Sequence, residues 1–221
     1  MKVVSIVGAR PQFVKAAPVS RELQRKHQEV LLHTGQHYDY GMSQDYSTLT
    51  AARSPVLEML RVRAGAYLLA TLHRPHNTDD PARLQAILEA FEIVGEPIIF
   101  TAYPRTREAM FQQAQRVPPN VHLIEPVGYL DMVRLERQAR AILTDSGGVQ
   151  KEAHLLEVPC VTLREETEWV ETVQAGWHRL VGADRDRIVA ALGDLQVPVE
   201  HPLLFGNGHA AEKIVTLLDS E

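Results

Sequence analysis

The turn TDSGGVQKEA, residues 144–153, has the residue types and spacing of an anion-binding site. An apolar run ends before it, and a helical pattern begins just after Gly147 and Gly148. Beyond a strand of a parallel α/β sheet, the free N–H groups and the positive dipole end of the next helix attract anions. Glycines let a phosphate approach the backbone, and Ser146 adds a hydroxyl donor. Glu152, one turn further on, could accept hydrogen bonds from two hydroxyls of a ribose. A tight turn that uses its glycines only for packing is the alternative.

A second polar cluster, LHRPHNTDD at residues 72–80, also follows an apolar run. We expect His73 and Arg74 to lie at the same sheet edge as Ser146, where a cation or a general acid would stand beside a phosphate. His73 and His76 are three residues apart, but no cysteine or third histidine has a matching spacing. We therefore expect no metal ion.

A third turn, GARPQFVK at residues 8–15, supplies two cations, Arg10 and Lys15, that can reach an anion. Considered alone, this segment fits equally well a surface turn followed by a solvated lysine.

Apolar β-rich runs alternate with amphipathic helical runs from residue 66 onward, which is typical of βαβ units and a parallel sheet. Asp80 can cap one of these helices, and Pro81 suits its first position. The expected strands are 66–72, 97–102, 121–125, 141–144, 160–163 and 179–181. The expected helices lie within 79–94, 129–139, 149–158 and 184–195.

The first 44 residues form a separate βαβ start, in which Pro18 should kink or end the helix. So small a unit cannot bury a core unaided, so we expect it to pack on the larger domain or on another chain, which favours a homodimer. Residues 45–65 show no strand pattern and are interpreted as a connector. The predicted organisation is therefore 1–44, 45–65, 66–200 and a last helical segment, 201–221.

The composition excludes several protein classes. The 221 residues are 45% hydrophobic and 23% charged, with a net charge of −5. No concentrated basic face is apparent for nucleic acid, and no apolar run is long enough to span a membrane. We expect a cytoplasmic protein without nucleic-acid or membrane partners. Cys160, the single cysteine, is interpreted as an inert core thiol.

Several motifs together resemble the non-hydrolysing UDP-N-acetylglucosamine 2-epimerases. The resemblance covers residues 1–44 and about 66–221, and it implies two Rossmann-like doubly wound α/β domains of the glycosyltransferase-B type, with the first reduced here to a remnant. It also implies elimination of UDP to a 2-acetamidoglucal and its re-addition, which interconverts UDP-GlcNAc and UDP-ManNAc without a cofactor. The motifs are IVGARPQFVKAAPV, TGQHYDYGMS, HRPHNTDDPARL, VHLIEPVGYLDM, LTDSGGVQKEA, PCVTLREETEWVETVQAGWHRLVG and GNGHAAEKI.

The resemblance assigns roles to individual residues. His73 matches the active-site histidine beside the diphosphate leaving group. Met132 falls at a position that borders the uracil. The remaining matches are UDP ligands: the phosphate-binding Arg10 and Lys15, the diphosphate turn Ser146, Gly147 and Gly148, and the ribose-binding Glu152.

The departures from the family concern catalysis. Segments of the GDT, EAGLR and PEE types, whose carboxylates are the acid and base candidates, are absent from the sequence. General acid–base help is typically worth about 10²- to 10⁴-fold. Three hypotheses follow: an active epimerase, which would need these carboxylates from a second chain; a non-catalytic UDP-binding remnant; and an interaction domain that binds no nucleotide.

Overall fold

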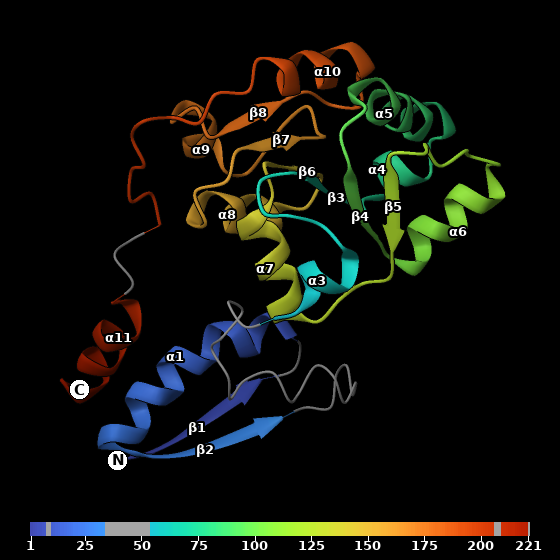
Figure 1. Cartoon of the computed structure of the whole chain (residues 1–221). Coiled ribbons are helices and arrows are strands. Elements are labelled where there is room, and N and C mark those ends of the chain that lie inside the picture. The colour runs from blue at the N-terminus through green and yellow to red at the C-terminus, as the bar shows by residue number, and fades with distance from the viewer. Residues whose placement is uncertain (8–9, 34–53, 206–208, 221) are drawn as a thin grey trace. The chain divides into compact units, whose positions relative to one another are not determined.

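The chain divides into two compact units (Figure 1). The computed structural model describes residues 1–7, 10–33, 54–205 and 209–220, with 10–15 and 33 described by their backbone alone. The smaller unit comprises Met1–Leu49 and Leu203–Glu221, and the larger one Thr50–Pro202. Part of the expected connector therefore belongs to the larger unit, where helix α3 (Val56–Leu60) buries two of its apolar side chains.

The larger unit is built on a six-stranded parallel sheet in the order β5-β4-β3-β6-β7-β8. The chain starts at the centre with β3, runs to one edge, returns to the centre and runs to the other edge. This is the order of a doubly wound nucleotide-binding sheet, and it confirms the predicted fold class. The strands are β3 (Leu68–Leu72), β4 (Ile98–Ala102), β5 (Val121–Ile124), β6 (Ala141–Thr144), β7 (Cys160–Thr162) and β8 (His178–Leu180).

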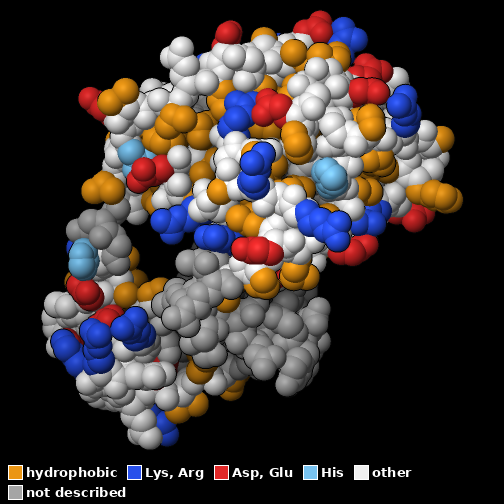
Figure 2. All heavy atoms as spheres, in the orientation of Figure 1, with side chains coloured by type: hydrophobic (Ala, Val, Ile, Leu, Met, Phe, Trp, Pro, Cys, Tyr) orange, Lys and Arg blue, Asp and Glu red, His pale blue; other side chains and the backbone are white. Residues whose placement is uncertain are grey.

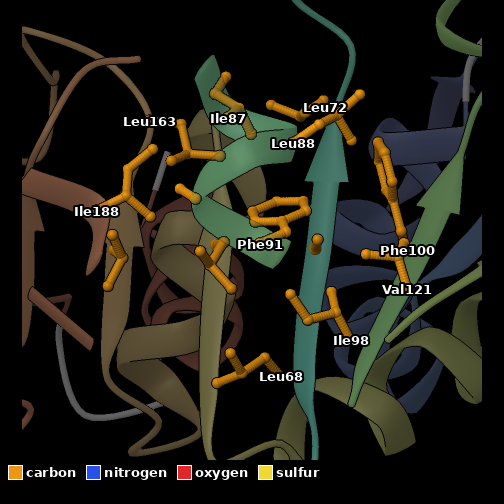
Figure 3. Packing of buried hydrophobic residues seen from close by; sticks show 14 of the residues in the cluster. Leu68, Leu72, Ile87, Leu88, Phe91, Ile98, Phe100, Val121, Leu163 and Ile188 are labelled. Atoms are coloured by element: carbon orange, nitrogen blue, oxygen red, sulfur yellow. The ribbon is translucent and has the colours of Figure 1, made fainter. Parts of the chain in front are cut away.

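Helices cover both faces of this sheet. Alternate side chains of each strand point to opposite faces, and because both sets are apolar, both faces must be buried. Leu68 and Leu72 pack with Phe91 in one core cluster (Figure 3), whereas Tyr67 and Leu69 belong to a second cluster. The first cluster lies under α5 (Pro81–Val94), α6 (Pro104–Gln112) and α10 (Arg185–Gly193). The second lies under α3, α7 (Tyr129–Gln138) and α8 (Gly147–Leu155). Two short helices, α4 (Pro75–Thr78) and α9 (Val170–Gln174), complete the unit.

Helix α5 begins as predicted. The Asp80 carboxylate accepts hydrogen bonds from the backbone N–H groups of Ala82 (2.9 Å) and Arg83 (3.2 Å), and Pro81 occupies the first helical position. Asp80→Ala should lower the free energy of unfolding by about 1 kcal/mol, the usual cost of losing such a cap. Urea denaturation measures it. Because Ser and Asn also cap helices, Asp80→Asn should restore most of the loss, and an equal loss in both variants would contradict the capping role.

Buried histidines are a second feature of the larger unit. His154 and His178 are almost fully buried, and the rings of His154 and His201 lie 4.4 Å apart between centroids. His178 Nδ1 lies 2.8 Å from the Thr172 hydroxyl. Burial, together with His154 nearby, lowers the pKa of His178 to about 4, although the backbone of Gln150 opposes the shift. Burial also lowers the pKa of His154.

The smaller unit combines the two ends of the chain. Strands β1 (Lys2–Val7) and β2 (Gln28–His33) pair in parallel, joined by helix α1 (Arg10–Lys26), which packs against α11 (Ala210–Asp219). Lys26 Nζ and His27 Nε2 lie 2.9 and 2.8 Å from the carboxylate oxygens of Asp219. Helix α1 continues through Pro18, so of the two expected outcomes the helix end there is wrong, whereas the kink stays a prediction; Pro18 is exposed.

One face of this small sheet carries exposed apolar side chains. Val4 pairs with Val30 and Ile6 with Leu32, and each of these four side chains is at least 40% exposed. Within the smaller unit, these apolar side chains of the sheet are therefore not covered. Packing of this unit on the larger one or on another chain stays a prediction. A homodimer remains a prediction.

The surface of the larger unit mixes charges of both signs. On the face shown in Figure 2, Lys and Arg side chains are interspersed with Asp and Glu. Within the described ranges, none of the helices has the length and apolar character needed to cross a bilayer.

Candidate functional site

The carboxyl ends of β3 and β6 meet where the strand order reverses, and a buried carboxylate joins them there. Asp145 follows β6 and is fully buried. Its oxygens accept hydrogen bonds from the backbone N–H groups of His73 and Arg74, each at 3.1 Å. The Asn77 side-chain amide donates a further bond at 3.1 Å. Asp145 therefore fixes the turn after β3 against the turn after β6.

The same carboxylate orients His73. His73 Nδ1 lies 3.1 Å from Asp145 Oδ1, and the imidazole is 42% exposed. Because a carboxylate only accepts hydrogen bonds, Nδ1 carries a hydrogen, and Nε2 is the ring atom that can exchange a proton or hydrogen bond with a ligand. The ring of Tyr103, which follows β4, lies 6.0 Å from the His73 ring between centroids.

Helix α8 begins at the turn that the sequence singles out. Ser146 is its N-cap, and the Ser146 hydroxyl oxygen accepts a hydrogen bond from the Val149 N–H at 3.4 Å. This bond uses the oxygen as an acceptor and leaves the hydroxyl hydrogen to donate to a ligand. Gly147 and Gly148 form the first helical turn, where backbone N–H groups have no partner within the helix. The arrangement suits an anion.

Side chains from two other loops surround Gly147. A Cβ atom there would lie 3.4 Å from Glu168 Oε2, 3.6 Å from Trp169 Nε1 and 3.9 Å from an Arg74 nitrogen. The Trp169 indole N–H donates to the Gly147 carbonyl at 2.7 Å. Side chains from two other loops thus converge on the start of α8, and a Cβ at Gly147 would be in van der Waals contact with them.

Arginine and glutamate side chains form ion pairs around this turn. Arg164 donates two hydrogen bonds to the Glu168 carboxylate, at 2.8 and 3.1 Å, and Arg74 lies 3.5 Å from it. The hydrogen bonds from Arg164 and the charges of both arginines lower the pKa of Glu168 to about 2. An anion that binds here must therefore compete with Glu168 for Arg74.

The other predicted residues lie in different places. Glu152 projects from α8, partly exposed, and Met132 lies in α7, partly buried beside the second core cluster. Arg10 and Lys15 belong to α1 of the smaller unit, and their side chains lie outside the described residues. The structure thus brings together His73, Ser146 and the two glycines.

Sequence reasoning missed the residues that hold the site together. Asp145 was read only as part of the turn, although a carboxylate as the last residue of an apolar run was a usable signal. Asn77 was a further signal within the polar cluster after β3. Arg164 and Glu168 come from the loop after β7, whose approach to α8 no local pattern shows. Among the described residues, no group of three or more His, Cys, Asp or Glu side chains could hold a metal ion.

Comparison with known proteins shows the family to which the chain belongs. The family model for UDP-N-acetylglucosamine 2-epimerase matches residues 45–219, well over half of the chain. The chain belongs to the UDP-N-acetylglucosamine 2-epimerase family. A UDP-N-acetylglucosamine 2-epimerase homolog of Methanococcus maripaludis is 30% identical over 355 aligned positions that cover 99% of each protein. Since this chain has only 221 residues, that alignment contains a long gap.

Other members of the family align without that gap. The UDP-2,3-diacetamido-2,3-dideoxy-D-glucuronate 2-epimerase of Pseudomonas aeruginosa is 45% identical over 157 residues. The UDP-N-acetylglucosamine 2-epimerase of Methanocaldococcus jannaschii is 42% identical over 163 residues. Each alignment covers 69% of this chain and 44% of the relative, so the matched part spans less than half of these epimerases.

Solved structures of epimerases share the fold. The Methanocaldococcus jannaschii UDP-GlcNAc 2-epimerase in complex with UDP-GlcNAc and UDP superposes with a TM-score of 0.84 at 23% identity, covering all of both chains. CalG4, the calicheamicin glycosyltransferase, gives 0.52 over 71% of this chain and 43% of its own. The architecture is therefore the glycosyltransferase-B-like one that the sequence predicts.

Proposed function

We propose that this chain binds UDP, and the UDP part of UDP-N-acetylglucosamine, at the turn between β6 and α8. The observation that carries the proposal is the junction at Asp145, which holds His73 and Arg74 beside the exposed N-terminus of α8. A diphosphate there would meet backbone N–H groups, the Ser146 hydroxyl and the Arg74 guanidinium. Two relatives are named for substrates that have different sugars but the same UDP part. The proposal therefore concerns the nucleotide.

In the proposed complex, each residue has a separate task. The α8 turn binds the diphosphate, and Glu152 accepts hydrogen bonds from the ribose hydroxyls. His73 offers Nε2 to the diphosphate oxygen that leaves C1 of the sugar, while Asp145 keeps the ring in place through Nδ1. Arg10 and Lys15 are further proposed phosphate ligands, and Met132 a neighbour of the uracil.

Interconversion of UDP-GlcNAc and UDP-ManNAc needs one more group. When the C2 proton is removed, the C1–O bond breaks, UDP leaves with the bonding electrons, and a C1=C2 double bond forms. The family segments with carboxylates suited to take that proton are missing from this sequence. We therefore propose that the chain by itself binds the nucleotide without turning over the sugar.

A thermal melt with and without UDP tests the binding. A ligand that binds only the folded state stabilises it by RT ln(1 + [L]/Kd), about 2.7 kcal/mol at a hundredfold excess over Kd. UDP should raise the melting temperature, and uridine, which lacks the diphosphate, should raise it far less. A melting temperature that UDP does not change would contradict the proposal.

Matched variants locate the nucleotide. Ser146→Ala and Glu152→Ala should each reduce the UDP-dependent shift, whereas Glu166→Ala, an exposed carboxylate in the loop after β7, should not. Exchange of the C2 proton of UDP-GlcNAc in heavy water separates binding from turnover. We expect no exchange here and full exchange with the Methanocaldococcus jannaschii enzyme as a positive control.

A further inference from the structure

A buried carboxyl group on α7 has no role in the site described so far. Glu136 lies in the last turn of α7 and is fully buried. The preceding residue, Leu135, belongs to the second core cluster. Neither of its carboxyl oxygens accepts a hydrogen bond from any donor among the described residues. A glutamate is almost never buried in this way unless it is paired or neutral.

The groups that face Glu136 come from α8 and β7. The carboxyl group of Glu152, on α8, lies within hydrogen-bonding reach of Glu136. Helix α7 packs directly against α8, and the Cys160 thiol on β7 is also close enough to sense the Glu136 charge. Glu136 therefore touches, from the core side, the residue that we propose as the ribose ligand.

Two adjacent carboxyl groups can share a hydrogen bond only if one of them carries a proton. Burial first, and then the charge of Glu152 and the hydrogen bond to it, raise the pKa of Glu136 well above its usual range. Burial raises the pKa of Cys160 to about 12, so the thiol adds no charge near neutral pH. Glu136 is thus the carboxyl group that holds the proton, and Glu152 is its acceptor.

We infer that Glu136 is a positioning residue, which donates a hydrogen bond to Glu152 and holds that carboxylate toward the ribose hydroxyls of the nucleotide. This inference rests on the proposed function and deepens it, because it names the group that determines selectivity for a ribonucleotide. A carboxylate held on one side by a fixed donor presents its remaining lone pairs in a fixed direction, which suits two vicinal hydroxyls.

The preference for UDP over 2′-deoxy-UDP is the readout, measured by calorimetric titration. A general loss of folding weakens both ligands equally, whereas misplacing Glu152 weakens UDP more than 2′-deoxy-UDP, which offers Glu152 only its 3′-hydroxyl. Glu136→Met, an unbranched apolar replacement, should reduce the preference about tenfold, as expected for losing a hydrogen bond to a charged group. Glu136→Gln keeps a donor at the same position and should retain the preference.

The pH profile provides a second readout. As pH rises through the raised pKa of Glu136, two neighbouring carboxylates would repel each other, and the preference for UDP should fall in the wild type. The Gln variant has no proton to lose there, so its preference should stay constant over the same range. Infrared spectra of the ligand-free wild type at neutral pH should show a protonated carboxylic acid band that the Gln variant lacks.

The outcomes separate the two proposals. If wild-type protein binds no UDP, the proposed function fails and the positioning role fails with it. If the wild type prefers UDP and Glu136→Met keeps the full preference, only the role of Glu136 is overturned. A missing infrared band would likewise overturn it without affecting UDP binding.

Discussion

Replacing Asp145 by alanine should lower the free energy of unfolding by about 3–5 kcal/mol, since it leaves one buried and two partly buried donors without their acceptor, at about 1–3 kcal/mol for a buried group. The donors are the backbone N–H groups of His73 and Arg74 and the side-chain amide of Asn77. Their bonds all end on one carboxylate with no solvent exposure, so water cannot simply replace it. Urea denaturation monitored by circular dichroism measures the loss.

Two companion variants make this result specific. Asp145→Asn keeps one acceptor oxygen and should lose roughly half as much, which also provides a folded protein if the alanine variant does not fold. Asp79→Ala removes an exposed carboxylate on the neighbouring turn that pairs with Arg105, and should cost no more than about 1 kcal/mol. Equal losses for Asp145→Ala and Asp79→Ala would show that the junction does not stabilise the fold.

The second large effect is a loss of stability in acid caused by His178. Its pKa is about 4 in the fold and 6.5 in its ordinary state, so the unfolded chain binds more protons between these values. Stability is therefore complete above about pH 6.5 and falls as the pH drops toward 4. The lowered pKa of His178 corresponds to about 3 kcal/mol of stability. His154, whose pKa is also lowered, adds to the loss in the same direction.

His178→Asn isolates this contribution. Asparagine can keep the hydrogen bond to the Thr172 hydroxyl but does not titrate, so its unfolding free energy should fall less steeply between about pH 6.5 and 4. His122→Asn, which changes an exposed histidine, should leave the slope of the wild type unchanged. The two free energies are measured by urea titration at a series of pH values. Parallel curves for His178→Asn and the wild type would refute the account.

The strands of the larger unit could be predicted from the sequence, because strands buried on both faces appear as short apolar runs. The run at 141–144, for example, matches β6 residue for residue. Its helices α5, α7, α8 and α10 could also be predicted, whereas α3, α4, α6 and α9 were not expected. Helix α3 lies in the segment interpreted as a connector, because Pro55 interrupts it and its amphipathic stretch is short; Val56 and Leu57 become helical core by joining the second cluster.

The site was predictable only where it follows local chemistry. The apolar run before Ser146 and the helical pattern after Gly148 are enough to predict the turn between β6 and α8. The bonds from Asp145 to the backbone near residue 73 depend on β3 lying beside β6, which the alternation of elements leaves open. Glu136 stands among charged residues in LERQ and resembles a solvated helix position, so its burial depends on how α7 lies against α8.

The pairing of the two chain ends in the smaller unit has a consequence for biosynthesis. Helix α11, which packs on α1 and places Asp219 against Lys26 and His27, is translated after the whole of the larger unit. The larger unit can therefore fold while the first strands still lack their partner helix. Until residues 210–219 are translated, the surface of α1 that packs against α11 is open to chaperones, and a ribosome that stalls before Ala210 releases a chain whose N-terminal unit lacks α11.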